Sequence, residues 1–375
     1  MTARAGSGWN LPGPAADSTR PLSASRLWLR HLACFVLPLT TLGFALTGPH
    51  RWYTALPWFG VVIVSVLLDS RAAPARRQPD PALPTWPFDA VLIALVGLQV
   101  ANIVLTARLI SLAGFWSTDA LIAALLVGVN SGYSAIVVGH ELVHRRDRRL
   151  QLLGRLLLCT VMYEHFFTEH VRGHHVRVGT PEDPATARFG ESYHQFWWRT
   201  VPAQFRSAWR LETKRLGAVD MKWYDRRILK SRVLHGVVAE VSLAATLGIV
   251  FGPAALVVFL LQALGAVRLL EAVNYFEHWG LVRSGRKVQP LDSWDTESWF
   301  SLYTLVGLSR HADHHAHASR PYQQLRHFDE SPKLPRGYFG MVVMAVLNNR
   351  RFQKLMTAEL QRRRLGPFLE EPQPS

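Results

Sequence analysis

The segment FDAVLIALVGLQVANIVLTA, residues 88–107, is apolar apart from Asp89 and a few uncharged polar side chains. Its length is about that which a helix needs to cross the hydrocarbon core of a bilayer, roughly 20 residues. Five further runs have a similar length and composition, at 31–48, 52–69, 118–138, 235–252 and 253–276. The sequence therefore predicts an all-α integral membrane protein with six transmembrane helices.

The composition of the whole chain also indicates a membrane protein. Hydrophobic residues make up 49% of the sequence, with 13 Trp and 18 Phe. A formal charge of +15 would also suit a nucleic-acid-binding protein. The arginines, however, lie mostly between and after the apolar runs, so we expect the lipid bilayer as partner and no nucleic acid.

The distribution of basic residues predicts an orientation. Six spans place both termini on one side, and the tight turns at 48–51 and 251–253 lie on the other. The side of the termini receives Arg26, Arg30, Arg71, Arg76, Arg77, Arg145, Arg146, Arg148, Arg149, Arg283, Arg286 and Lys287. The positive-inside bias predicts that this side is the cytoplasm and that the protein lies in the cell inner membrane.

One membrane domain over 25–361 is expected between two disordered tails. Residues 1–24 are rich in Gly, Pro, Ser and Ala and show no charged start followed by an apolar core, so we expect a cytoplasmic tail rather than a signal peptide. Residues 362–375 are rich in charge and proline. The large segments 139–234 and 279–375 are expected to be cytoplasmic and partly helical, with a re-entrant or buried helix near 150–162.

Cysteine content limits the redox chemistry of the chain. Only two cysteines occur, Cys34 and Cys159, each within a separate apolar run. This excludes a disulfide framework and any C-x-x-C pair. It also excludes an in-chain rubredoxin or iron–sulfur domain held by four thiolates.

Histidines are bunched in the two cytoplasmic segments. The sequence has 16 histidines, and eight fall in three clusters: His140 and His144; His170, His174 and His175; His311, His314 and His315. On a helix, residues four apart share one face, so each cluster is expected to offer two or three nitrogens to one point. His140 follows the fourth span directly, so the clusters are expected to converge on one face of the membrane.

The number of ligands narrows the type of metal site. Imidazole suits iron, zinc, copper and nickel. The H-E-L-V-H motif at 140–144 is also the signature of zinc proteases, but such a site needs only three protein ligands. Two metals with four or five imidazoles each agree better with the count, and two irons could activate dioxygen. Solvated surface histidines remain the simplest alternative, and a metal transporter would carry ligands within its spans.

At these residues the chain resembles the bacterial alkane 1-monooxygenases of the membrane fatty acid desaturase and hydroxylase superfamily. The resemblance covers roughly residues 30–350. It rests on HELVHRRD at 140–147, EHVRGHH at 169–175, TPEDPATARFGES at 180–192, NYFEHWGL at 274–281 and RHADHHAH at 310–317.

The resemblance implies a fold of six spans around a di-iron centre, with dioxygen as co-substrate. It implies that His278 joins the eight clustered histidines as a ninth ligand, and that electrons come from a separate rubredoxin or ferredoxin with its reductase. Three positions depart from the family pattern, because Trp279 replaces Tyr, Ser309 replaces Gln and Ala312 replaces Ser. SWDTESW at 293–299 also differs from the usual SWNSNH, which leaves the substrate open.

Carboxylates beside the motifs are candidates for orienting the ligands, since metal-binding imidazoles usually donate their second N–H to such a group. They are Glu141, Asp147, Glu169, Asp183, Glu277 and Asp313. Glu141 is the expected catalytic carboxylate because it stands between two expected ligands at the mouth of a span.

The leading functional hypothesis is hydroxylation of the terminal carbon of an alkane or a similar alkyl chain. Hydroxylation or desaturation of an aromatic methyl, terpene or fatty acyl group is the close alternative, and a membrane zinc protease is the alternative from another class.

Overall fold

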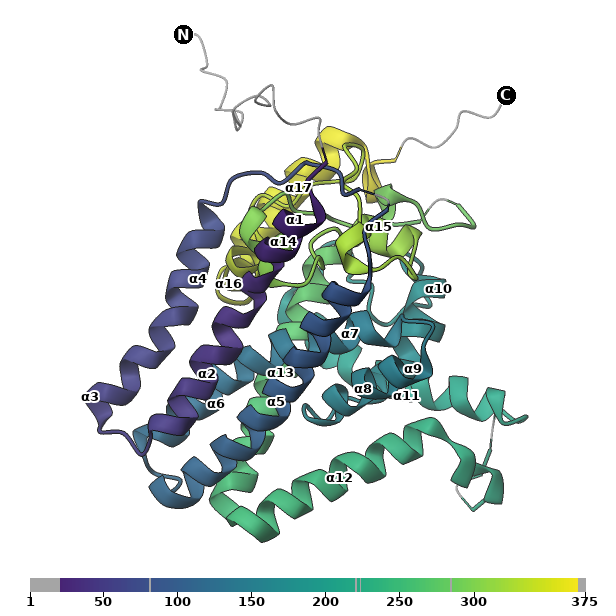
Figure 1. Cartoon of the computed structure of the whole chain (residues 1–375). Helices are drawn as coiled ribbons and strands as arrows, with labels where there is room; N and C mark the ends of the chain where they lie inside the picture. Colours follow the sequence, from purple (N-terminus) through teal and green to yellow (C-terminus); the bar gives the residue numbers. More distant parts are fainter. Residues whose placement is uncertain (1–20, 81, 220, 223, 284, 370–375) are drawn as a thin grey trace, which may run out of the picture.

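The computed structural model describes residues 21–80, 82–219, 221–222, 224–283 and 285–369, which form a bundle of helices with a helical head at one end (Figure 1). Among these residues there is no strand, and extended backbone pairs only at two isolated bridges, Pro74 with Ser298 and Asp295 with Lys333. The predicted all-α class is confirmed.

Six helical segments of the described chain are long and apolar enough to cross a bilayer, as predicted. They span Ala24–Thr47, Trp52–Ser70, Trp86–Ala113, Thr118–Val143, Arg232–Phe251 and Pro253–His278. The helices that build them are α1 (Ala24–His31), α2 (Val36–Thr47), α3 (Trp52–Ala55), α4 (Gly60–Ser70), α5 (Trp86–Ala113), α6 (Thr118–Ser131), α7 (Val138–Val143), α12 (Arg232–Phe251) and α13 (Pro253–His278). The chain is therefore a multi-pass membrane protein.

The outer faces of the spans have the composition expected for contact with lipid. Leu121, Val241 and Ile249 are exposed apolar side chains within the spans. Trp52 and Trp116 are exposed beside the turns at one end of the bundle, which is the position where aromatic residues mark a membrane surface.

Helix α13 lies in the middle of the bundle and contacts α5, α6, α12 and α16. Its contact with α6 is close because small residues face each other. A Cβ added at Gly128 would lie 3.3 Å from the carbonyl oxygen of Gln262 and 3.7 Å from the Cα of Gly265. Small residues let helix backbones approach in this way. The packing fixes the span that ends at His140 and His144 relative to the span that ends at His278.

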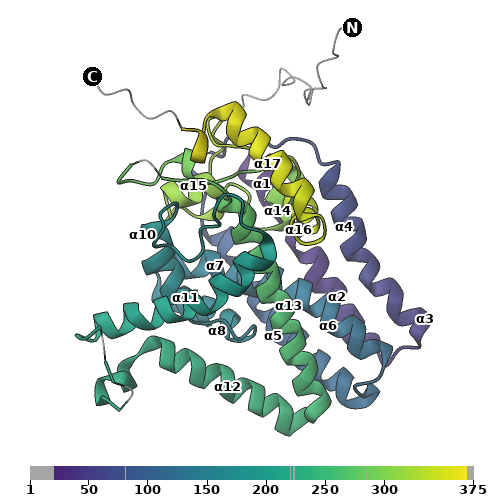
Figure 2. The same ribbon diagram turned by 180° about the vertical axis from the view of Figure 1, so that it is seen from behind.

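The remaining helices form the head at one end of the bundle. They are α8 (Arg148–Cys159), α9 (Phe166–Glu169), α10 (His175–Arg177), α11 (Tyr193–Arg215), α14 (Trp299–Thr304), α15 (His311–Ala316), α16 (Tyr338–Leu347) and α17 (Asn349–Arg363). Helices α1, α15 and α17 lie at the same end in both views (Figure 2). The first and last helices thus share one side, as six spans require.

Helix α8 lies where the sequence predicts a re-entrant or buried helix. One face packs on α7, where a Cβ at Gly154 would lie 2.9 Å from the carbonyl oxygen of Gly139. Leu157 and Leu158 are buried, whereas Leu152 and Leu156 are exposed. The helix is therefore buried on one side only.

Most of the two expected tails, residues 1–20 and 370–375, lies outside the described residues. Residues 362–369 are folded, because α17 continues to Arg363 and a 3-10 turn follows over Gly366–Phe368. The ring of Phe368 lies 5.6 Å from that of Phe189. At the other end Leu22 is buried. Whether the chain beyond these points is disordered stays a prediction.

Candidate metal centre

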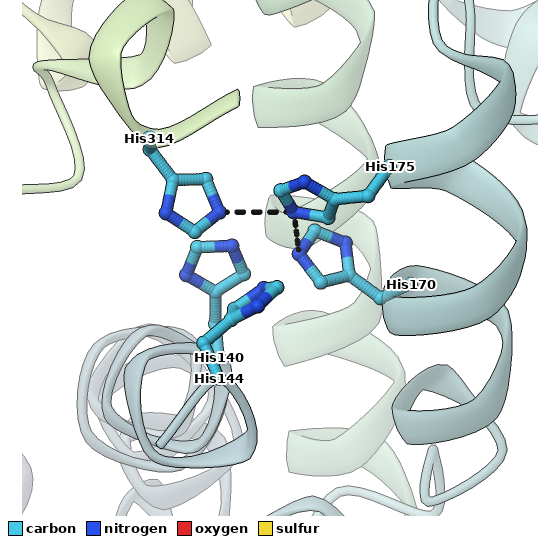
Figure 3. A group of neighbouring side chains, drawn as sticks. All are labelled: His140, His144, His170, His175 and His314. Atoms are coloured by element: carbon cyan, nitrogen blue, oxygen red, sulfur yellow. Dashed lines mark hydrogen bonds between the residues drawn. The ribbon is translucent and has the colours of Figure 1, made fainter. Parts of the chain in front are cut away.

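All nine histidines expected as ligands lie together where the spans meet the head, but as two groups. Within each group the side-chain nitrogens that could bind a metal lie within 4.8 Å of one another. The first group (Figure 3) comes from α7, from the segment around α10 and from α15, and consists of His140, His144, His170, His175 and His314. The second group consists of His174, His278, His311 and His315.

The spacing of the nitrogens within each group is that of ligands around one ion. In the first group the Nε2 atom of His175 lies 3.0 Å from those of His170 and His314. In the second group the Nε2 atom of His311 lies 3.2 Å from that of His278 and 2.9 Å from that of His315. Metal–nitrogen bonds of about 2.1 Å at right angles separate neighbouring nitrogens by about 3.0 Å.

The expectation that each cluster serves one point is wrong for two of the three clusters. Residues 170–174 form a π-helix, in which the hydrogen bonds run from residue i to residue i+5. His170 and His175, five apart, therefore share the first group, and His174 turns to the second. Helix α15 divides in the same way, with His314 in the first group and the pair His311 and His315 in the second.

Burial keeps the imidazoles in the form that binds metals. Burial, with the nearby His174 ring, lowers the pKa of His144 to about 3, and burial lowers the pKa of His170, His175, His311, His314 and His315 well below the ordinary range. Neutral imidazole is the ligating form.

Several of these rings also have an unsatisfied nitrogen. The Nε2 atoms of His140, His144 and His174 are buried and have no hydrogen-bond partner among the described residues. A buried polar atom left unpaired is costly, so the donor set is suited to metal ions at both groups.

Two carboxylates contact the rings. Asp183 accepts a hydrogen bond from Nδ1 of His174 at 2.9 Å and another from the Thr186 hydroxyl at 2.6 Å. Burial opposes ionisation of Asp183, yet the His174 ring and these hydrogen bonds hold its pKa below the ordinary value. The Oε2 atom of Glu277 lies 3.2 Å from Nε2 of His311. Asp183 has the contact of a carboxylate that orients a ligand, because it accepts from Nδ1 of His174 and leaves Nε2 free. Glu277 instead lies beside the Nε2 atom of His311 that faces His278 and His315, so it is placed on the metal side of that ring.

Glu141 has other partners than the expected ones. Its carboxylate forms an ion pair with Arg145 at 3.0 Å and accepts the backbone N–H of Tyr322 at 3.1 Å. Arg145 in turn lies 3.0 Å from Asp89 of α5. These contacts connect the end of the fourth span to α5 and to the backbone of Tyr322. The hydrogen bond to a ligand ring that was expected of Glu141 is made by Asp183 instead.

Two further histidines near the motifs lie apart from both groups and have carboxylate partners of their own. His317 contacts Asp313 at 2.9 Å, and His327 contacts Glu297 at 3.0 Å. Sequence reasoning did not single out Tyr338, whose hydroxyl donates to Glu277 at 2.6 Å. No motif marks this tyrosine, because it lies 61 residues from its partner.

An apolar cavity of about 150 Å³ reaches both histidine groups. Apolar side chains of α4, α13 and α16 and of the π-helix at 132–137 form much of its wall. His140 and His170 of the first group and His311 of the second line it. A largely apolar space with a few polar groups is typical of a binding site for a hydrophobic molecule.

Comparisons with known proteins agree with this arrangement. The family described as fatty acid desaturase matches residues 114–343. The chain is 43% identical over 229 residues to alkane 1-monooxygenase 1 of Pseudomonas aeruginosa, an alignment that covers 60% of this chain and 59% of that protein. It is 35% identical over 335 residues to alkane 1-monooxygenase 2 of the same organism, covering 85% and 87% of the two chains.

A more distant relative is the hydroxylase component of a xylene/toluene monooxygenase from Pseudomonas putida. It is 24% identical over 318 residues, covering 81% of this chain and 82% of that one. The first alignment spans less than two thirds of its relative, but the second covers nearly all of both chains. This chain belongs to the fatty acid desaturase family and, within it, to the group of the alkane 1-monooxygenases.

Proposed function

We propose that the protein is a non-haem di-iron monooxygenase that hydroxylates the terminal carbon of an alkane or a similar alkyl chain with dioxygen. One observation carries the proposal: two groups of buried imidazoles lie at an apolar cavity among membrane-spanning helices. The relatives named as alkane 1-monooxygenases support the choice of reaction.

We assign the first group of five histidines to one iron and the second group of four to the other. Imidazole suits iron, and the unpartnered Nε2 atoms are the donors that such ions would take. Bound in this way, two irons would supply the reductive activation of dioxygen. The overall reaction is RH + O₂ + 2e⁻ + 2H⁺ → ROH + H₂O, which balances atoms and charge.

The protein's own residues would position the reactants. The valines and leucines of the cavity would hold the alkyl chain and exclude water, which favours reaction at the carbon nearest the metals. Asp183 would fix the tautomer of His174, so that Nδ1 carries the proton and Nε2 faces the metal.

Electrons would come from a separate rubredoxin or ferredoxin with its reductase. The two cysteines of this chain are buried and belong to separate helical segments, so they do not form a redox pair. The chain would lie in the cell inner membrane with the termini and the metal centre in the cytoplasm, because basic residues gather on the side of the head.

A second candidate is oxidation of another hydrophobic group, such as an aromatic methyl, terpene or fatty acyl chain. The relative named as a xylene/toluene monooxygenase component favours this reading for an aromatic methyl. A zinc protease agrees less well with the site, because His140 and His144 share their group with three further histidines.

The test is product analysis with purified protein in lipid nanodiscs, supplied with iron, a rubredoxin, its reductase and NADH. An alkane, an alkylaromatic and a fatty acid compete as substrates under ¹⁸O₂. We expect a primary alcohol of the alkane that carries one ¹⁸O atom. A labelled benzylic alcohol in its place would favour the second candidate, and unlabelled or absent product would overturn the proposal.

A further inference from the structure

A buried carboxylate at the end of the second span is not explained by the proposed site. Asp69, the next-to-last residue of α4, is 2% exposed. Charged side chains are costly at such places and need partners. Among the described residues four groups donate hydrogen bonds to the carboxylate of Asp69, and none belongs to its own helix.

The four donors come from two other helices of the head. Ser298 and Ser301, at the start of α14, donate their hydroxyls to Oδ1 at 2.6 and 2.7 Å. Phe339 and Gly340, in the first turn of α16, donate backbone N–H groups to Oδ2 at 2.9 and 3.3 Å. A carboxylate is favoured at a helix N-terminus because it meets the free N–H groups and the positive end of the helix dipole.

Helix α16 begins with Tyr338, which connects the hydrogen bonds of Asp69 to the histidines. Its backbone N–H donates to the Ser301 hydroxyl at 2.8 Å. Its side-chain hydroxyl donates to Oε1 of Glu277 at 2.6 Å. The ring is 1% exposed and packs edge-on against Phe276 at 4.9 Å, so the hydroxyl has little freedom to move.

Glu277 completes the connection to the second histidine group. Its Oε1 atom accepts from Tyr338 while its Oε2 atom lies 3.2 Å from Nε2 of His311. The order of contacts is therefore Asp69, Ser301, Tyr338, Glu277 and His311. Each step is a hydrogen bond or an ion-pair contact between buried groups.

The hydrogen bonds between Asp69 and the first turn of α16 also join two walls of the cavity. Val62 and Val66 of α4 line it on one side, and Phe339 and Val342 of α16 line it on another. Few contacts hold α4 elsewhere, since only 17% of its span is buried in the protein. The position of both walls thus depends on how α4 is fastened to the start of α16.

We propose that Asp69 is a positioning residue: by fastening α4 to the first turn of α16 it holds the Tyr338 hydroxyl on Glu277 and sets the cavity wall against the second histidine group. The part of this proposal that concerns the product alcohols rests on the proposed function. It predicts that Asp69 and Tyr338 act as one unit on the metal site, although the hydrogen-bond partners of the Asp69 carboxylate in the described part of the chain include no histidine.

The variants are Asp69→Asn, Tyr338→Phe and the double variant. Asparagine has the shape of aspartate, but its NH₂ group would face hydrogen-bond donors. Phenylalanine keeps the ring and loses only the hydroxyl. The matched control is Ser65→Ala, one turn earlier in α4, because the Ser65 hydroxyl is buried but donates only to Val61 of its own helix. If Asp69→Asn does not accumulate in membranes, Ser301→Ala replaces it, since the Ser301 hydroxyl lies between Asp69 and Tyr338.

The first readout is Fe(II) retained per chain during titration with a chelator, which needs no turnover. We expect each single variant to lose one iron at about tenfold less chelator than the wild type, because the Tyr338 hydroxyl holds the carboxylate that lies beside the metal-facing Nε2 of His311. This is the effect usual for a partner one contact away from the metal-binding groups. The double variant should match Tyr338→Phe rather than multiply the two effects. The second readout is the ratio of terminal to internal alcohol, which should fall in the same variants and stay constant in Ser65→Ala.

The outcomes separate the two proposals. A wild-type protein that retains no iron would overturn the proposed function. A wild-type protein that retains iron, with an Asp69→Asn variant that has the same retention and product ratio, would overturn the role of Asp69 alone. Multiplied effects in the double variant would also overturn it, because they would mean that Asp69 acts on stability independently of Tyr338.

Discussion

The contact between Asp183 and His174 allows a quantitative test of the second histidine group. Asp183 is 2% exposed, and the hydrogen-bond partners of its carboxylate among the described residues are all donors: Nδ1 of His174, the Thr186 hydroxyl and the backbone N–H of Ala185. Asparagine at this position has the same shape but one acceptor oxygen instead of two. In either orientation its NH₂ group must face at least one of these donors.

The expected cost follows from the hydrogen bond that is lost. A hydrogen bond to a charged group contributes about 1.5–3 kcal/mol. At 1.36 kcal/mol for each factor of ten, this weakens binding about 10- to 150-fold. Replacing partners of metal-binding imidazoles usually weakens metal binding about 10- to 100-fold, which agrees. Asp183→Asn should therefore bind the iron of the second group about 10- to 100-fold more weakly and leave the first group nearly unchanged.

The assay is equilibrium dialysis of purified protein against buffered Fe(II), with iron counted per chain. Asp119→Asn is the matched control, because Asp119 is also buried and accepts from a histidine ring, that of His50, at 2.7 Å. His50 lies in the turn between the first two spans and Asp119 at the start of the fourth span, so this pair should affect stability without affecting iron. Unchanged iron affinity in Asp183→Asn, or an equal loss in Asp119→Asn, would refute the reasoning.

Three further predictions concern the cavity, pH and the electron donor. Val342→Phe should exclude the longest alkanes from turnover by filling part of the cavity, whereas Leu347→Phe, exposed at the end of the same helix, should not; identical product profiles by gas chromatography would contradict this. Burial lowers the pKa of His165 to about 4, so the unfolded state takes up the proton first as pH falls below about 6.5 and stability falls with it. In denaturant titrations in detergent, the stability lost between pH 7 and 5 should be about 2 kcal/mol smaller in His165→Phe than in the wild type, and equal losses in both proteins would count against this account. If arginines on the side of the head, such as Arg146 and Arg148, attract an acidic rubredoxin or ferredoxin, complementary charge mainly raises the rate of association. At a limiting concentration of this electron donor, turnover should then fall steeply as salt rises past about 0.15 M, while turnover at a saturating concentration changes little. Salt-independent turnover at a limiting donor concentration would exclude such a charged binding surface.

The sequence was sufficient to predict a membrane protein with six spans, because each span is one continuous run of apolar residues. The run at 88–107 predicts α5 from length and composition alone, and the other five spans follow in the same way. Bunched histidines were equally local, so all nine members of the two groups could be named, His278 among them through the resemblance to the family.

The division of the ligands between two groups could not be predicted in the same way. Spacing of four residues correctly pairs His140 with His144 but fails for His170 and His174. The π-helix there changes the period of the backbone, and nothing in the spacing of residues 170–175 signals it. A helix of regular period would have placed His170 and His174 on one face.

Contacts between residues far apart in the sequence could not be predicted from local patterns either. Glu141 looked like the best carboxylate because it stands between two ligands in the sequence, yet its contacts are Arg145 and the backbone of Tyr322. Asp69 lies 229 residues from Ser298 and 270 residues from Phe339 along the chain. Such contacts depend on the assembled bundle, and no periodicity indicates them.

The most direct test of the central proposal is the iron content of three purified proteins: the wild type, His144→Ala from the first group and His315→Ala from the second. Elemental analysis should give two irons per chain for the wild type and about one for each variant, with each variant losing a different iron in its Mössbauer spectrum. One iron in the wild type, zinc in place of iron, or loss of the same iron in both variants would contradict two separate histidine-bound sites.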